Sequence, residues 1–336
     1  MNNNILELEL DFSLFSKYRT QLMGIAALGV VLCHAMPYGV NLGHLSILFS
    51  HGAFGVDLFL LLSGFGIYFS LQKYNHYSVL AWYTKRIKRI IFPYIITITP
   101  FLIIYVLLFK KTIIDFLECI SFISYFKNHF GLWFLPCILL LYLFSPIYKA
   151  LFDTSSKIKG KVLITLCTVL VFCFLGSYHL IVDENSVLYN TQVLLGRSAS
   201  FFIGWGTGYL AKLNTKISVY KLLIGIVIIH FLFYFILPKG FSWWWIYTIP
   251  VTFILCYLIR FFLRFKHLNN FLLFLGSISL ESYITNWGLT LVFPPLLTWL
   301  GVSVYINKTI QYSIVVLLGI LLAGLANKCV AKINKI

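Results

Sequence analysis

The side chains that could do chemistry in this sequence stand inside or beside long apolar runs. His34 lies near the end of the run that begins at residue 20, Asp57 lies in the next run, and Glu281 lies in a run near the C-terminal end. Two antiparallel membrane helices would bring His34 and Asp57 to a similar depth. A neutral imidazole that a carboxylate orients can take a proton from a hydroxyl, so this pair predicts general-base chemistry. The alternative is a packed histidine bonded to a neighbouring carbonyl.

A basic segment precedes the third apolar run. The sequence WYTKRIKRIIFPY (82–94) carries Lys85, Arg86, Lys88 and Arg89. Arginine forks grip phosphate groups through paired hydrogen bonds, so this segment predicts a site for an anionic cytosolic ligand. The alternative, strongest for Lys85 and Lys88, is that these cations only anchor the run at the membrane surface.

Further polar and aromatic residues are expected in the middle-to-outer membrane. Asn286 follows Glu281 by five residues, about 7–8 Å along a helix axis, and Trp133 and Tyr142 enter from the outer end of their run. Cys33 adjoins His34. Adjacent helix residues point about 100° apart, which argues against a Cys–His nucleophile pair.

The elements that position these residues must be membrane helices, because the composition excludes a soluble domain. Of the 336 residues 60% are hydrophobic and only 11% are charged, whereas a soluble domain is about a quarter charged. The net charge of +16 does not indicate nucleic acid, because the basic residues cluster at the ends of apolar runs. Seven cysteines without a CxxC spacing support neither a disulfide framework nor a metal site.

The apolar runs predict an all-α, polytopic membrane protein of about ten transmembrane helices, in a single domain over residues 1–336. The expected spans are 20–37, 52–72, 90–109, 131–150, 161–177, 197–211, 219–237, 243–262, 269–292 and 310–327. Residues 1–17 are expected to form a cytoplasmic tail. Residues 112–126 are expected to lie along the interface or to re-enter the membrane, because Asp115 and Glu118 break their apolar face.

The distribution of basic residues predicts the orientation. With both termini in the cytoplasm and ten spans, all but six of the 26 basic residues fall on the inner side. The six exceptions are Lys110, Lys111, Lys127, Arg197, Lys239 and Lys308. Removing or adding one span would spoil this asymmetry, so the positive-inside rule favours the even number.

Six segments in order resemble the acyltransferase-3 superfamily, the integral membrane enzymes that O-acylate bacterial surface glycans and related acceptors. The segments are RTQLMGIAALGVVLCHA (19–35), GAFGVDLFLLLSGFGIYFSL (52–71), WYTKRIKRIIFPY (82–94), GLWFLPCILLLYLFSPI (131–147), GRSASFFIGWGTGY (196–209) and LGSISLESYITNW (275–287). Each segment alone is a weak signal, but six in the right order with ten expected spans form a fairly specific one.

The resemblance implies a reaction, its partners and a set of roles. Family members look like ten-helix enzymes of the bacterial cytoplasmic membrane that take an acyl group, usually acetyl, from cytosolic acyl-CoA. They pass it to a hydroxyl of a cell-surface polysaccharide, glycolipid or lipid-linked sugar. Acetyl-CoA is then a co-substrate, no cofactor is tightly bound, membrane lipids surround the protein, and homo-oligomerisation stays open. The implied roles are His34 as base or acyl relay, Asp57 as its partner, Arg86 and Arg89 with Lys85 at the CoA phosphates, and Trp133, Tyr142, Glu281, Tyr283 and Asn286 at the tunnel or acceptor.

Two departures from the family pattern stand out. Many members have Arg eleven residues before the histidine, where this chain has Met23. Arg19, one turn earlier, is expected to replace it at the acyl-CoA site. Many members also end the SLE motif with His, where Asn286 stands here, and an amide cannot shuttle a proton near neutral pH.

Two rival functions remain open on the sequence alone. One is a secondary transporter or exporter of a surface-glycan precursor, although internal repeats and paired broken helices are not evident. The other is a membrane scaffold without catalytic activity, in which Asp57 and Glu281 only pair helices. No hydrolase-like domain accompanies the spans, so under the enzyme hypothesis we expect the spans and the outer loops 37–51 and 178–196 to handle the acceptor.

Overall fold

The apolar runs fold into helices that form two compact units in the computed structural model. The structure describes residues 9–41, 43–73, 78–177, 186–236, 244–302 and 306–333. The first unit comprises Met1–Leu22, Val56–Tyr83 and Cys137–Asn269, and the second comprises Met23–Gly55, Thr84–Pro136 and Asn270–Ile336. Each unit therefore combines segments that lie far apart in the sequence.

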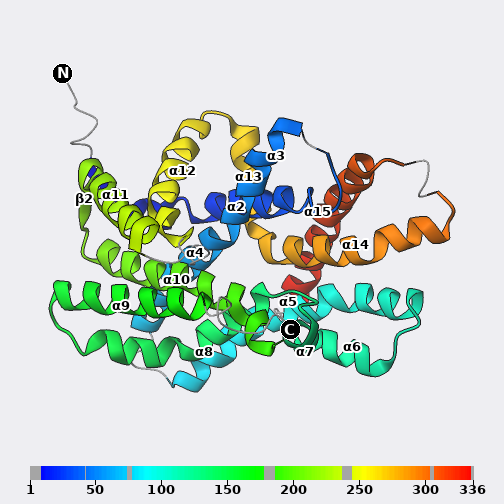
Figure 1. Cartoon of the computed structure of the whole chain (residues 1–336), viewed down its shortest axis with the longest axis horizontal. Helices are drawn as coiled ribbons and strands as arrows, with labels where there is room; N and C mark the ends of the chain where they lie inside the picture. The colour runs from blue at the N-terminus through cyan, green and yellow to red at the C-terminus, as the bar shows by residue number, and fades with distance from the viewer. Residues whose placement is uncertain are drawn as a thin grey trace. The chain divides into compact units, whose positions relative to one another are not determined.

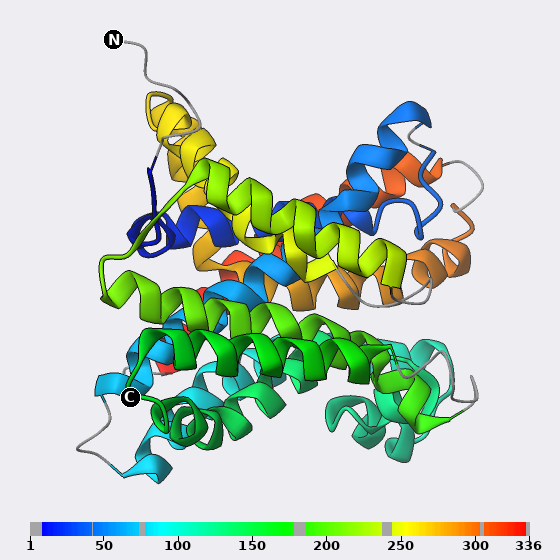
Figure 2. The same ribbon diagram turned by 60° about the vertical axis from the view of Figure 1, so that its left-hand side comes forward.

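The described part of the first unit holds all or most of six long helices and a two-stranded sheet. Its elements are β1 (Glu9–Asp11), α1 (Ser13–Lys17), α4 (Phe54–Lys73), α8 (Phe134–Asp153), α9 (Ile158–Gly176), α10 (Val187–Lys212), β2 (Lys216–Ser218), α11 (Val219–Ile236), a 3₁₀ helix (Trp244–Tyr247) and α12 (Thr248–Phe262). Helices α9 and α10 lie side by side (Figures 1 and 2). A Cβ on Gly176 would lie 2.2 Å from the Cα of Gly196, so glycines let these two backbones touch.

The described part of the expected N-terminal tail packs within the first unit. Strand β1 pairs antiparallel with β2, with Leu10 opposite Ile217. Phe15 of α1 is fully buried, and its ring centroid lies 4.8 Å from that of Phe253 in α12. Residues 1–8 of the expected tail lie outside the described residues. The tail is therefore folded from residue 9 onward because it carries Leu10, Phe12 and Phe15, which bury apolar surface.

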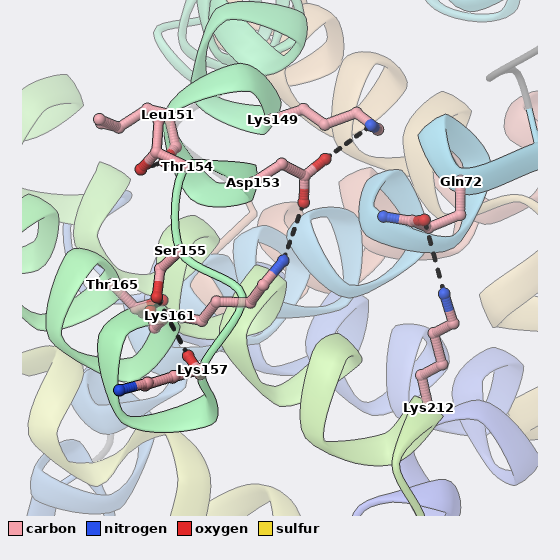
Figure 3. A network of polar contacts seen from close by, with 10 residues as sticks. All are labelled: Gln72, Lys149, Leu151, Asp153, Thr154, Ser155, Lys157, Lys161, Thr165 and Lys212. Atoms are coloured by element: carbon pink, nitrogen blue, oxygen red, sulfur yellow. Dashed lines mark hydrogen bonds and ion pairs between the residues drawn. The ribbon is translucent and has the colours of Figure 1, made fainter.

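The turn between α8 and α9 gathers basic side chains around one acid (Figure 3). The Asp153 carboxylate accepts hydrogen bonds from Lys149 and Lys161 at 2.7 and 2.9 Å. Lys161 also lies over the ring of Tyr209 in α10, 5.2 Å from its centroid. One carboxylate thus offsets two of the cations that the sequence analysis assigns to the inner side.

The second unit is built around α14 and α15. Its elements are α2 (Arg19–Cys33), 3₁₀ helices at Gly43–Leu45 and His51–Ala53, α3 (Ser46–Ser50), α5 (Val79–Leu108), α6 (Ile113–Ile120), α7 (Ile123–Asn128), α13 (Lys266–Ser277), α14 (Ser279–Trp299) and α15 (Lys308–Ile333). Helices α14 and α15 pack against each other (Figure 1). Phe101 of α5 meets Gly288 of α14, where an added Cβ would lie 2.5 Å from the ring. Phe101, Leu289, Val292 and Val315 form a core cluster that joins the three helices.

Each of the ten expected spans falls on helical structure, with three differences in extent. Helix α5 begins at Val79 and α10 at Val187, well before the apolar runs, because Lys, Arg, Gln and Leu are good helix formers that extend a helix into the polar zone. The expected span 269–292 is two helices, with a break at Ile278 between α13 and α14. Residues 112–126 form the short helices α6 and α7.

By length and apolarity, six helical segments in the described part of the chain can cross a membrane. They are His51–Lys73, Val79–Leu108, Phe134–Asp153, Ile158–Gly176, Trp245–Phe262 and Lys308–Ile333. Arg19–Cys33 and Val219–Leu232 are apolar but shorter. The all-helical membrane character that the sequence predicts is therefore supported, apart from the small sheet, whereas the count of ten remains a prediction.

Candidate functional site

His34 follows directly after the last residue of α2. Its Nδ1 lies 2.6 Å from the carbonyl oxygen of Val30. Its backbone N–H donates to the carbonyl oxygen of Val31. A carbonyl only accepts hydrogen bonds, so Nδ1 carries the proton and the neutral ring keeps its lone pair on Nε2. The imidazole is exposed. This arrangement fixes the tautomer that a general base needs.

The carbonyl groups at the end of α2 are tied to neighbouring side chains. The Tyr312 hydroxyl, from α15, donates to the Val31 carbonyl. Cys33 donates from its thiol to the Val30 carbonyl at 3.1 Å, and its Sγ lies 3.7 Å from Nδ1 of His34. The two side chains are thus closer than helical geometry predicts, because the helix ends between them. Nδ1 is nevertheless the protonated nitrogen, so it is not poised to deprotonate the thiol.

Glu281 lies near the start of α14, which begins at Ser279. It occupies the first turn, where the helix dipole favours a carboxylate. Its Oε1 accepts a hydrogen bond from the Asn327 amide of α15 at 3.0 Å. Glu281 is only 5% exposed. Asn327, which the sequence did not single out, is thus the side-chain partner of Glu281.

Asn286 faces α15 one turn further along α14. Its amide nitrogen donates to the Ser282 carbonyl at 2.8 Å, while a Cβ on Gly319 would lie 2.9 Å from both amide heteroatoms. The Thr285 hydroxyl donates to the Gly319 carbonyl at 2.8 Å. Among the described residues, the buried Oδ1 of Asn286 has no hydrogen-bond partner. An acceptor without a donor therefore lies buried between α14 and α15.

Aromatic side chains line another part of the second unit. Tyr283 packs edge-on against Phe134, 5.8 Å between centroids, and Phe134 packs edge-on against Trp133 at 6.3 Å. Trp287 contacts Phe130 in the same manner. Trp133 and Tyr283, which the sequence analysis named, are thus linked through a phenylalanine it did not name.

The basic residues of 82–94 belong to one helix, α5. Lys85, Lys88 and Arg89 are exposed and Arg86 is half-buried. Residues three and four apart on a helix are neighbours, so Lys85, Arg86 and Arg89 share a face. Like charges at such spacing repel, and an anionic ligand would relieve that repulsion.

Asp57 belongs to the first unit, whereas His34 belongs to the second. Within the first unit Asp57 is 1% exposed and pairs with Arg197 of α10. The Ser200 hydroxyl donates to the other carboxylate oxygen at 3.1 Å and lies 3.4 Å from the Thr248 hydroxyl. The orienting role of Asp57 toward His34 stays a prediction.

Arg197 is the residue that sequence reasoning missed. It was assigned to the outer end of a span, but α10 begins ten residues earlier, which sets Arg197 about 15 Å inside the helix. The sequence did contain a signal for Arg197: it stands in GRSASFF and is followed only by small and apolar residues. A charge at membrane depth requires a partner, so this pattern indicates a buried ion pair.

Two further predicted residues also belong to the first unit. The Arg19 guanidinium donates to the Leu62 carbonyl at 3.3 Å and packs over Gly66, where a Cβ would lie 2.8 Å away. Tyr142 contacts Trp82 and Phe201 with its ring. The hydrogen bond thus holds Arg19 on α4, and the missing side chain at Gly66 leaves room for its guanidinium.

The helices, their apolar surfaces and the buried polar groups define a multi-pass membrane protein. A family model described as an acyltransferase domain matches residues 21–328, and the chain belongs to this family. The resemblance to the acyltransferase-3 superfamily is thereby confirmed. No curated protein and no solved structure matches the chain.

Proposed function

We propose that the protein transfers an acyl group, acetyl in the simplest case, from cytosolic acyl-CoA to a hydroxyl of a cell-surface polysaccharide, glycolipid or lipid-linked sugar. The observation that carries the proposal is the bond from His34 Nδ1 to the Val30 carbonyl. It leaves Nε2 as the base for an acceptor hydroxyl. The exposure of the ring suits a base that must meet an acceptor.

The donor is proposed to bind at the other end of α14 and α15. Asn327 and Tyr312 are fifteen residues apart on α15, or about 22 Å, and mark the Glu281 end and the His34 end of the second unit. Arg86, Arg89 and Lys85 would hold the CoA phosphates. The role of Arg19, which belongs to the first unit, stays a prediction from the sequence. The pantetheine arm would then extend along α14 past Asn286 toward His34, within reach of Trp133 and Tyr283.

We further propose ten spans with both termini in the cytoplasm of a bacterial inner membrane. The ten expected runs all coincide with helical structure, and the basic residues favour this orientation. Reporter fusions after residues 155 and 214 should then report a cytoplasmic location, and a fusion after residue 128 an external one. Any reversed reporter would contradict the proposed topology.

A transfer assay tests the enzymatic proposal. Wild-type protein in lipid vesicles should transfer label from [¹⁴C]acetyl-CoA to an extracted glycan or glycolipid fraction, and His34→Ala should abolish transfer. The control is His267→Ala, because His267 is also exposed and lies outside the segments that the proposal assigns to the donor or the acceptor. Unchanged transfer by His34→Ala would remove His34 from the mechanism. Mass spectrometry of surface glycans with and without the protein would identify the acceptor.

A further inference from the structure

Tyr38 lies one turn beyond His34 on the same stretch of chain. Its backbone N–H donates to the His34 carbonyl at 3.2 Å. This hydrogen bond closes one turn of the backbone between the two residues. Tyr38 is therefore hydrogen-bonded through its backbone to His34, the base in the proposed function.

The Tyr38 ring is held at the junction of two core clusters. It packs against the cluster of Phe101, Leu289, Val292 and Val315, and also against Ala35, Val40 and Tyr312. Its centroid lies 5.0 Å from that of Tyr312, and the Lys308 ammonium lies 5.6 Å above the ring. These contacts fix the ring between the end of α2 and helices α5, α14 and α15.

The Tyr38 hydroxyl is buried, and among the described residues it has no hydrogen-bond partner. The neighbouring Tyr312 hydroxyl, by contrast, donates to a backbone carbonyl. Burying a hydroxyl without a partner costs about 1–3 kcal/mol, and phenylalanine would fill the same space without that cost. Burial also raises the pKa of Tyr38, so the hydroxyl stays protonated and able to donate at neutral pH. A donor of this kind is suited to a ligand oxygen.

We propose that Tyr38 is a catalytic residue whose hydroxyl donates a hydrogen bond to the thioester carbonyl oxygen of acyl-CoA. This inference rests on the proposed function. A fixed donor aimed at an oxygen that gains negative charge stabilises the transition state more than the ground state. The apolar residues around the hydroxyl strengthen that interaction, because they lower the local dielectric.

The proposed transfer is direct and forms no covalent acyl-enzyme intermediate. His34 Nε2 takes the proton of the acceptor hydroxyl while the acceptor oxygen forms a bond to the thioester carbon. The carbonyl oxygen becomes an oxyanion that accepts the hydrogen bond from Tyr38. Collapse of the tetrahedral intermediate breaks the C–S bond, and the imidazolium returns the proton to the departing thiolate, giving an ester and free CoA.

The variant Tyr38→Phe tests this role, because it removes only the hydroxyl. It should lower kcat about 10²-fold or more, the usual effect of losing one oxyanion donor, and leave KM for acetyl-CoA within about twofold of the wild-type value. Its melting temperature should be unchanged or higher, since an unpartnered polar group is removed. Tyr105→Phe is the matched control, because Tyr105 packs against the same four-residue cluster.

The outcomes separate this inference from the proposed function. If the wild-type protein fails to transfer acetyl groups from acetyl-CoA, the proposed function fails, and with it the basis for the inference. If wild type is active, His34→Ala is inactive and Tyr38→Phe keeps wild-type kcat, the function stands and the role of Tyr38 is wrong. An equal loss of kcat in Tyr105→Phe and Tyr38→Phe would likewise overturn it, because a packing effect would then explain both.

Discussion

The Arg197 guanidinium pairs with the Asp57 carboxylate, whose side chain is only 2% exposed. Removing one member of a buried ion pair leaves an uncompensated charge and destabilises a protein by about 3–5 kcal/mol. We therefore expect both Asp57→Asn and Arg197→Gln to lower the unfolding free energy in detergent by about that amount. Thermal or chemical unfolding of the purified variants measures it.

The double variant Asp57→Asn with Arg197→Gln separates folding from chemistry. It removes both charges, so most of the stability should return, and the two substitutions should not be additive. If the double variant is as unstable as the sum of the single variants, the pair does not stabilise the first unit as argued. If it is stable but inactive, Asp57 has a role in transfer beyond this ion pair.

Helix positions followed from the sequence because apolar runs of the length of a bilayer leave little choice of structure. The break at Ile278 did not, because LGSISLES contains no proline and no charge before Glu281. Glu281 was consequently expected within one continuous span, 269–292, whereas it lies in the first turn of α14. Local sequence did not indicate that turn.

The sequence named candidate site residues, but the contacts that the structure gives them were not predicted. Glu281 was identified because charges are rare in apolar runs, and Arg89 because it belongs to the basic segment 82–94. Tyr38, Asn327 and Arg197 were not assigned roles. Asn327 and Tyr38 lie in runs where uncharged polar residues are common, so residue type alone gave no reason to single them out. Their significance depends on contacts between segments far apart in the chain, which spacing along one helix does not specify.

Arg89 should govern donor binding more than turnover. Charged hydrogen bonds contribute about 1.5–3 kcal/mol, so Arg89→Ala should raise KM for acetyl-CoA by at least about tenfold with little change in kcat. Lys88→Ala is the matched control, since Lys88 is also exposed on α5. Steady-state kinetics at several salt concentrations would measure both. An equal rise in KM for the two variants would indicate general surface charge and not a phosphate site at Arg89.

Helix α6 should be insensitive to mild acid. Hydrogen bonds from the Thr112 backbone N–H and hydroxyl lower the pKa of Asp115. A carboxylate whose pKa is lower in the folded than in the unfolded protein stabilises the fold fully at pH values above its unfolded-state pKa, about 3.9 for Asp. This stability is lost only as the pH falls through the folded-state pKa. Amide exchange of residues 113–116, corrected for intrinsic rates, should thus be equal at pH 7 and pH 5. Asp115→Asn should raise it at both pH values, and a rise for wild type at pH 5 would contradict the capping role.

The crossing of α14 and α15 should depend on the absence of a side chain at Gly319. A Cβ there would lie 2.9 Å from the Asn286 amide, whereas a Cβ on Gly324 of the same helix would meet Phe274 at an ordinary 3.7 Å. Overpacking of this kind costs about 1–3 kcal/mol, so Gly319→Ala should destabilise the protein and Gly324→Ala should not. Because Asn286 is the group displaced, adding Asn286→Ser to Gly319→Ala should restore part of the lost stability. Equal melting temperatures for the two glycine variants would show that α14 and α15 do not meet closely at Gly319.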